Sequence, residues 1–302
     1  MTNKGDIKIL SIIAEYKYLT IKQISILCQR SIQIIRRRIR SFFGKGLIVA
    51  GERVFSEGVG RKESVIIISD KGLKILKDKK IISKHATYIT DKTSDLFFVE
   101  HDLLVNWFLI HLLQIERINQ RFKILFFTTS SHNLAQGDSR GSLIMEHFLN
   151  NDKPDKTYTM IPDGVFTITD KKTNRSLLFF LEVDMGSETV ASPTQSQKDI
   201  KQKVNNYQAL FKYETYKKYN NITNCKFNGF RLLFLTNTRY RMESICRLVQ
   251  SISPSGFIWV TNQQQVFSKG AAAEIWAKGG YYKKKPQSIF KKLTFKAPSL
   301  IE

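Results

Sequence analysis

Three acidic residues stand in two segments that read as neighbouring strands. Asp163 follows Pro162, and Glu182 and Asp184 stand one residue apart further along the chain. Side chains at i and i+2 of a strand share a face, and a hairpin paired in register brings Asp163 beside Glu182 and Asp184. Oxygen ligands favour Mg²⁺ or Mn²⁺, which can activate water and stabilise charge on a scissile phosphate. We therefore take Asp163, Glu182 and Asp184 as candidate metal ligands and catalytic groups, with surface carboxylates as the alternative.

A lysine and a histidine are further candidates for this chemistry. The segment from about Gln195 to Tyr219 reads as a helix, and Lys203 lies on it one turn before Tyr207. A contact between Lys203 and the phosphate is implied only by the nuclease resemblance described below, and in a lysine-rich chain Lys203 could equally be solvated. His101 is expected either near the acidic residues or facing DNA, because no second histidine has the spacing of a metal site. For Tyr207 we expect aromatic packing.

The elements that must position these residues alternate between strand and helix. The expected strands are Arg121–Thr128, Tyr158–Thr169, Arg175–Val183, Phe230–Thr236 and Phe257–Thr261. The expected helices are Leu96–Ile118, Gln195–Tyr219 and Arg239–Ile252, with a short one around Leu143–Phe148. This order, α-β-β-β-α-β-α-β, predicts an α/β (α+β mixed) fold in which helices flank a mixed sheet.

The first 82 residues predict a winged helix-turn-helix domain. Three amphipathic helices, the second and third capped by Thr20 and Ser31, precede two β-rich runs joined by a glycine-containing basic turn. Along the third helix one stripe is apolar, and another, rotated from it, is polar and basic. The third helix of such a unit enters the major groove and the wing reaches along the backbone. The candidate DNA-binding residues are Gln33, Arg36, Arg37 and Arg40 on the helix and Arg61 and Lys62 on the wing.

The charge of the whole chain points to the same partner. Its 48 Lys and Arg residues exceed 26 Asp and Glu residues and give a formal net charge of +22, which is typical of proteins that bind a polyanion. Half of the excess lies in residues 1–80. After the first domain we expect a linker over residues 83–95, a second, nuclease-like domain over residues 96–266 and a basic tail over residues 267–302.

Several classes of protein are disfavoured by what the sequence lacks. Three scattered cysteines without a C-x-x-C spacing argue against a disulfide scaffold or a cysteine zinc site. No apolar run is long enough to span a bilayer, no signal-peptide core is seen, and no phosphate-binding GxxxxGK[ST] loop is present. We therefore expect a cytoplasmic protein without membrane attachment or NTPase activity, and a membrane-surface role ranks behind DNA binding.

The acidic motif resembles that of a nuclease superfamily. Pro162-Asp163 followed by Glu182-x-Asp184 is similar to the PD-(D/E)xK pattern, except that Asp184 stands where the pattern has lysine. Some members of the superfamily carry that lysine on the following helix, where Lys198, Lys201 and Lys203 are possible substitutes, and Lys203 lies one turn before Tyr207. The departure at Asp184 leaves catalysis open.

A narrower resemblance covers most of the chain. It rests on a winged helix followed in order by His101-Asp102-Leu103-Leu104-Val105-Asn106, Ile161-Pro162-Asp163-Gly164, Phe180-Leu181-Glu182-Val183-Asp184-Met185-Gly186-Ser187-Glu188-Thr189 and Lys203-Val204-Asn205-Asn206-Tyr207. This series resembles the replication-relaxation family of plasmid and mobile-element proteins. The resemblance implies a role in the replication and relaxation of plasmid DNA.

Two functions are compatible with these features. The first is a Mg²⁺- or Mn²⁺-dependent endodeoxyribonuclease that nicks or cleaves double-stranded plasmid or mobile-element DNA. The second is a non-catalytic winged-helix regulator of replication or transcription whose nuclease-like domain is degenerate. The carboxylates favour the first function, and the lysine missing from its usual position favours the second.

Overall fold

The chain has a mixed α/β fold with two compact units. A computed structural model describes residues 3–54, 63–82, 84, 96–128, 146–150, 153–191 and 199–290. Among these residues, those up to Ile110 form the first unit and those from His111 onward form the second. Helix α5 (Leu96–Ile118) begins in the first unit and ends in the second. Within the described ranges, no helix is long and apolar enough to cross a membrane.

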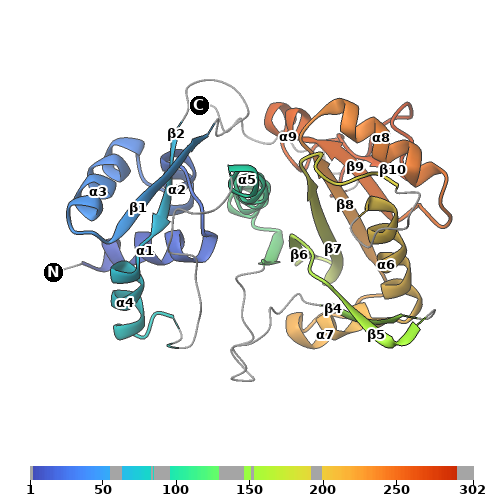
Figure 1. The fold of residues 1–302 in the computed structure, drawn as a ribbon, viewed down its shortest axis with the longest axis horizontal. Coiled ribbons are helices and arrows are strands. Elements are labelled where there is room, and N and C mark those ends of the chain that lie inside the picture. Colours follow the sequence, from blue (N-terminus) through green and yellow to red (C-terminus); the bar gives the residue numbers. More distant parts are fainter. Residues whose placement is uncertain are drawn as a thin grey trace. The chain divides into compact units, whose positions relative to one another are not determined.

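The first unit contains helices followed by a two-stranded antiparallel sheet (Figure 1). Its elements are α1 (Lys4–Tyr16), α2 (Ile21–Cys28), α3 (Ile32–Gly44), β1 (Ile48–Val54), β2 (Glu63–Ile68) and α4 (Asp70–Asp78). Both predicted helix caps form. The Thr20 side chain accepts from the backbone of Gln23 while the Gln23 side chain accepts from Thr20, and Ser31 accepts from Ile34 N–H. These caps fix where α2 and α3 begin.

The core of the first unit also takes in the first half of α5. Tyr18, Val65 and Ile67 pack with Val99 and Leu103 of α5. Hydrogen bonds reinforce this packing, because the Gln23 side chain donates to Leu103 O (3.1 Å). The Asn106 side chain likewise donates to Tyr16 O (3.0 Å) and Tyr18 O (2.8 Å). The sequence assigns all of α5 to the second domain, whereas its residues up to Ile110 pack in the first unit.

The second unit is built on a six-stranded mixed sheet in the order β10-β9-β8-β7-β6-β3. Its strands are β3 (Phe122–Phe127), β6 (Gly164–Asp170), β7 (Arg175–Asp184), β8 (Phe230–Thr236), β9 (Ile258–Asn262) and β10 (Ala277–Lys278). β7, β8 and β9 run parallel, while the β3–β6, β6–β7 and β9–β10 pairs are antiparallel. The C-terminal ends of β7, β8 and β9 therefore lie at one end of the sheet.

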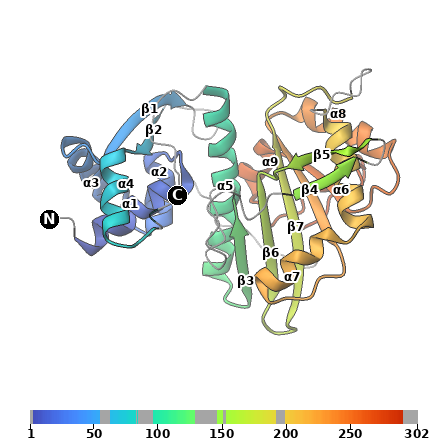
Figure 2. The ribbon, with the colours of Figure 1, turned by 60° about the horizontal axis from the view of Figure 1, so that its bottom comes forward.

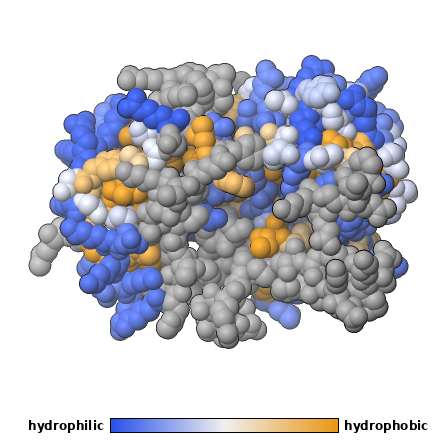
Figure 3. Space-filling model, viewed as in Figure 1, coloured by the Kyte–Doolittle hydropathy of each residue, from blue (hydrophilic) through white to orange (hydrophobic). Residues whose placement is uncertain are grey.

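Two helices, α6 (Ile200–Lys212) and α8 (Arg239–Gln250), cover one face of this sheet (Figures 1 and 2). Val204 of α6 and Ile245 of α8 are buried in the same cluster as Phe180 of β7 and Phe234 of β8. The outward side of α8 is polar, and the surface over this part of the second unit is mainly hydrophilic (Figure 3). This amphipathic division explains why α8 packs with its apolar side on the sheet.

Three local predictions differ from the structure. Glu146–Asn150 form strand β4, paired with β5 (Lys153–Met160), so the short helix predicted around Leu143–Phe148 is wrong. The strand predicted over Tyr158–Thr169 is interrupted between β5 and β6. The helix predicted over Gln195–Tyr219 ends at Lys212, because Glu214 adopts a left-handed conformation (φ 56°), and a short helix α7 (Lys218–Thr223) follows.

The segment from 267 to 290, predicted as part of a basic tail, belongs to the fold. Helix α9 (Gln263–Lys269) leads to β10, and Trp276 and Ile289 are fully buried. The Trp276 indole donates to Ala271 O (3.0 Å). Gly280 (φ 75°) packs so closely on Cys246 of α8 that a Cβ would lie 2.4 Å from its carbonyl oxygen. Only glycine fits there, and this contact ties the segment to α8.

Candidate functional site

Asp163 and Glu182 come together because β6 and β7 pair in register. Gly164 lies opposite Leu181, which places the residue before Gly164 next to Glu182. The backbone N–H of Asp163 donates to Leu181 O (3.1 Å), and Asp163 Oδ2 accepts from the backbone N–H of Val183 (2.7 Å). The Asp163 side chain thus extends the ladder between the strands, and its position is fixed by backbone atoms of β7.

Glu182 is buried, and each of its carboxylate oxygens has a partner on α6. Lys203 Nζ donates to Oε2 at 3.1 Å, and the Tyr207 hydroxyl donates to Oε1 at 2.6 Å. Lys203 and Tyr207 lie one helical turn apart, so α6 presents both to the same strand residue. The structure therefore brings together Asp163, Glu182 and Lys203, three of the residues that the sequence proposes for catalysis.

The charges in this cluster influence one another strongly. Burial raises the pKa of Glu182, and the nearby charge of Asp163 raises it further, while Lys203 and the Tyr207 hydroxyl oppose the shift. Burial alone would lower the pKa of Lys203. The negative charges of Glu182, Asp163 and Glu188 outweigh that effect and raise the Lys203 pKa, so the ammonium group stays protonated.

Glu188 is a member of this cluster that the sequence analysis did not single out. Its Oε2 lies 3.0 Å from Lys203 Nζ, so the ammonium group bridges Glu182 and Glu188. Asp163, Glu182 and Glu188 thus surround one lysine, and negative charge is in excess. Glu188 is part of the segment Phe180–Thr189 that resembles the family, but its position on the loop after β7 gave no reason to expect a contact with α6.

Asp184 is engaged elsewhere. Both of its oxygens accept from the Arg241 guanidinium at the start of α8, with Nη2 to Oδ1 at 3.1 Å, and Oδ1 also accepts from Gly186 N–H (3.2 Å). The sequence analysis missed Arg241. The parallel register gives the signal in retrospect, because Asp184 pairs with Thr236 at the end of β8, shortly before α8 begins.

The cluster can be compared with the needs of a divalent metal. Within the described part of the chain, no three His, Cys, Asp or Glu side chains gather in a way that could hold a metal ion. Mg²⁺, however, is often held by only one or two carboxylates, with water and substrate phosphates completing its shell. Asp163 and Glu182 fit that smaller set, in a cluster with excess negative charge. Asp184 is less suited, because Arg241 binds both of its oxygens in a one-to-one ion pair, whereas the single charge of Lys203 is shared between Glu182 and Glu188.

The predicted DNA-binding residues of α3 form an exposed stripe. The apolar residues Ile35, Ile39 and Phe42 of α3 are buried in the core of the first unit. The four predicted DNA-binding residues, Gln33, Arg36, Arg37 and Arg40, are all exposed. Arg38, between the stripes, instead lies 3.5 Å from the buried Asp6 of α1. The predicted wing residues Arg61 and Lys62 lie outside the described residues.

His101 belongs to the first unit, whereas the carboxylate cluster belongs to the second. Its Nδ1 lies 3.2 Å from Asp102 Oδ1, and Asp102 also lies 3.7 Å from Lys17 Nζ. These contacts give His101 a local partner in α5. The catalytic role proposed for His101 stays a prediction.

Comparison with known proteins identifies the family. No curated protein matches the chain. The family model described as replication-relaxation matches residues 10–225, which include α3, the Asp163–Glu182 pair and α6. This match covers well over half of the chain. The chain therefore belongs to the replication-relaxation family.

Proposed function

We propose that this protein binds double-stranded DNA of a plasmid or mobile element and nicks or cleaves it in a reaction that requires Mg²⁺ or Mn²⁺. The observation that carries the proposal is the contact between Lys203 of α6 and the buried Glu182, next to Asp163. This set supplies two carboxylates and a lysine, the combination of a PD-(D/E)xK site, although Asp184 occupies the usual lysine position. Family membership supports a role in replication or relaxation.

Each residue of the cluster has a distinct task in this proposal. Asp163 and Glu182 would hold the metal, which would stabilise charge on the phosphate and supply activated water. Lys203 stays protonated and would bind a phosphate oxygen. Tyr207 fixes the orientation of Glu182 through its hydroxyl, and Glu188 holds the other side of the Lys203 ammonium group.

The first unit would bind the DNA on which the second unit acts. Four exposed polar or basic residues on one side of α3 suit phosphate and base contacts in the major groove. Such contacts release counterions, so affinity would fall steeply with salt. The element order α1-α2-α3-β1-β2 supports the winged-helix assignment, and the predicted wing contacts by Arg61 and Lys62 are part of the same proposal.

A specific observation favours the second candidate function, a non-catalytic regulator. Arg241 neutralises Asp184, so the motif position normally held by lysine serves a structural ion pair. In such a regulator, the Glu182–Lys203 contact would only stabilise the second unit. The two functions differ in whether DNA strands are broken.

A plasmid-nicking assay distinguishes them. Supercoiled DNA with its cognate origin is incubated with the protein and Mg²⁺ or Mn²⁺, and open-circle product is measured. We expect Asp163→Asn, Glu182→Gln and Lys203→Met each to lower the rate by about 10²-fold or more, and chelation to abolish it. Lys201→Ala, an exposed lysine on the same helix, is the matched control. Salt-sensitive DNA binding without any open-circle product would favour the regulator.

DNA binding through α3 is tested separately. Arg36→Ala combined with Arg37→Ala should weaken duplex binding and reduce the slope of log K against log salt by roughly 1.8, about 0.9 for each lost phosphate contact. The control combines Lys71→Ala with Lys74→Ala, which removes the same charge from exposed positions of α4. Equal losses in both variants would show a general charge effect and contradict recognition by α3.

A further inference from the structure

The end of the sheet away from Glu182 and Asp184 carries two basic hollows. β7 runs from Arg175 to Asp184, so Arg175 marks the end opposite the carboxylates. The register places Leu178 of β7 next to Phe230 of β8 and Leu232 of β8 next to Ile258 of β9. The starts of β7, β8 and β9 therefore lie at this same end of the second unit.

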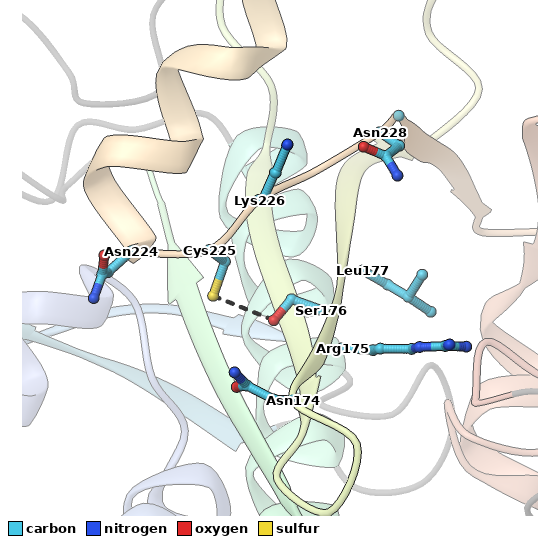
Figure 4. A pocket seen from close by; sticks show the side chains of 9 residues that line it. Asn174, Arg175, Ser176, Leu177, Asn224, Cys225, Lys226 and Asn228 are labelled. Atoms are coloured by element: carbon cyan, nitrogen blue, oxygen red, sulfur yellow. Dashed lines mark hydrogen bonds between the residues drawn. The ribbon is translucent and has the colours of Figure 1, made fainter.

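The first hollow, with a volume of about 660 Å³, lies between the start of β7 and the loop before β8 (Figure 4). β8 joins β7 only from Phe230 onward, so residues 175–177 border the hollow on that side. Arg175 and Lys226 supply positive charge, and Ser176 donates to Cys225 Sγ (3.2 Å).

Amide groups add neutral donors and acceptors to the first hollow. Asn174, Asn224 and Asn228 line it. Asn174, at the end of the β6–β7 turn, and Asn224, which caps the C-terminus of α7, adopt left-handed backbone conformations (φ 51° and 52°). None of the residues that line this hollow is acidic. The hollow therefore combines positive charge with neutral hydrogen-bonding groups, and such groups suit a phosphate.

The second hollow, about 230 Å³, lies beside β10 at the start of β9. Three lysines line it, Lys278, Lys284 and Lys285, and again no acidic residue does; its walls are mainly apolar, so the ammonium groups would meet a phosphate at its edge. Lys284 Nζ lies 4.2 Å from the centre of the half-exposed Tyr281 ring. Lys285 has one acidic neighbour, Glu274, at 3.5 Å and in an exposed position where such a pair contributes little.

We propose that these two hollows bind phosphates of one nucleic-acid strand, at a site separate from both α3 and the carboxylate cluster. Three strand spacings separate β7 from β10, or about 14 Å at ~4.8 Å each. A single phosphate cannot reach both hollows, whereas the regularly charged backbone of a nucleic acid can. The proposal does not depend on nuclease activity, because neither hollow contains a residue of the carboxylate cluster.

Binding is measured by fluorescence anisotropy with a single-stranded DNA oligonucleotide of about 16 nucleotides. The full chain carries Arg36→Ala and Arg37→Ala, which removes the proposed α3 contribution. In this background, Arg175→Ala with Lys226→Ala should weaken binding about tenfold and lower the salt slope by roughly 1.4, about 0.7 for each lost phosphate contact.

A second pair, Lys284→Ala with Lys285→Ala, should produce a similar loss. The matched control, Lys123→Ala with Lys212→Ala, removes the same charge from exposed positions of β3 and α6 and should change affinity less than twofold. All these side chains are exposed, so circular dichroism and the thermal midpoint should stay unchanged. Equal losses in the control and hollow variants would overturn the proposal, since they would indicate non-specific attraction.

Competition identifies the source of the phosphate. Duplex DNA, a 5′-mononucleotide and inorganic phosphate are each added to the complex with the single strand. If duplex DNA displaces the single strand at a far lower total phosphate concentration than the mononucleotide or inorganic phosphate does, the result supports a nucleic-acid site. Equal competition per phosphate would show a free-anion site instead. Protection of Lys226 and Lys284 from acylation in the complex, with Lys123 unprotected, is also required, and its absence would refute the location.

Discussion

Glu182 is a buried carboxylate whose oxygens are each satisfied by a different side chain of α6. The Tyr207 hydroxyl binds Oε1 and the Lys203 ammonium binds Oε2. A buried carboxylate that loses a partner bears the full cost of its desolvation. The same two contacts therefore stabilise the second unit and define the orientation of the residue proposed to bind metal.

Replacing Tyr207 by Phe removes one hydroxyl and leaves the aromatic packing on Phe180 in place. We expect the free energy of unfolding to fall by about 2 kcal/mol, because Glu182 Oε1 stays buried without its donor. Chemical denaturation measures this loss. Tyr240→Phe, at a position that is 78% exposed, is the control and should change stability by less than about 0.5 kcal/mol. Equal stability of wild type and Tyr207→Phe would contradict the hydrogen bond.

His111 of α5 gives the second unit a dependence on pH. Burial lowers its pKa to about 4, and its Nε2 has no hydrogen-bond partner among the residues that the structure describes. The unfolded chain, with an ordinary histidine pKa, binds a proton first as the pH falls. Above about pH 6.5 the neutral His111 therefore does not lower the free energy of unfolding. Between about pH 6.5 and pH 4 the free energy of unfolding falls by up to roughly 3 kcal/mol.

Replacing His111 by Phe should flatten this part of the stability profile. Phe keeps an aromatic ring near Phe267, whose ring centre lies 6.4 Å from that of His111, and it cannot take up a proton. Denaturation midpoints of wild type and variant are compared from pH 8 to pH 4. As the pH falls, the midpoint of the variant should rise relative to that of the wild type. Parallel pH profiles of the two midpoints would contradict the low pKa of His111.

At the scale of elements, one ion pair joins the end of β7 to the start of α8. Asp184 and Arg241 are 57 residues apart in sequence, and their side chains are 4% and 13% exposed. Arg241 Nη2 also donates to the backbone carbonyl of Glu188. The pair thus fixes the loop that carries Glu188 toward Lys203.

A double-mutant cycle tests this structural role. Arg241→Met leaves Asp184 buried and unpaired, and it should lower the free energy of unfolding by about 3 kcal/mol. Asp184→Asn combined with Arg241→Met should cost clearly less than the sum of the single changes, because no buried charge remains. Arg239→Met, at an exposed ion pair with Glu243, is the control and should cost less than about 1 kcal/mol. Additive losses would contradict direct coupling.

The sequence predicts elements well where local signals suffice. The capping residue Thr20 fixes the start of α2, and apolar spacing gives the bounds of α5 and β8 as the structure has them. Contacts between distant segments were harder to foresee. The Arg241–Asp184 pair and the insertion of Trp276 depend on strand order in space, which periodicity does not encode. Lys203 could be proposed only through the resemblance to a nuclease superfamily in which the lysine can lie on the helix after the acidic strand.

At the scale of the molecule, part of the positive charge lies on the surfaces that we propose to bind nucleic acid. The net charge of +22 includes the exposed arginines of α3 in the first unit and the basic hollows of the second. The carboxylate cluster reverses this sign locally around Lys203. The two proposed DNA-binding surfaces would together gain affinity when one DNA molecule contacts both, because the second contact would be intramolecular.

The length of the DNA should therefore determine how much each surface contributes. On a short duplex that fills one surface at a time, removing Arg36 and Arg37 should leave the weaker affinity of the hollows. On plasmid-length DNA, loss of either surface should weaken binding by about 10²-fold, more than on the short duplex, since avidity is lost. Anisotropy with short duplexes and filter binding with plasmid measure the two cases. Identical losses at both lengths would mean that the surfaces act independently, because intramolecular binding requires DNA that can span them.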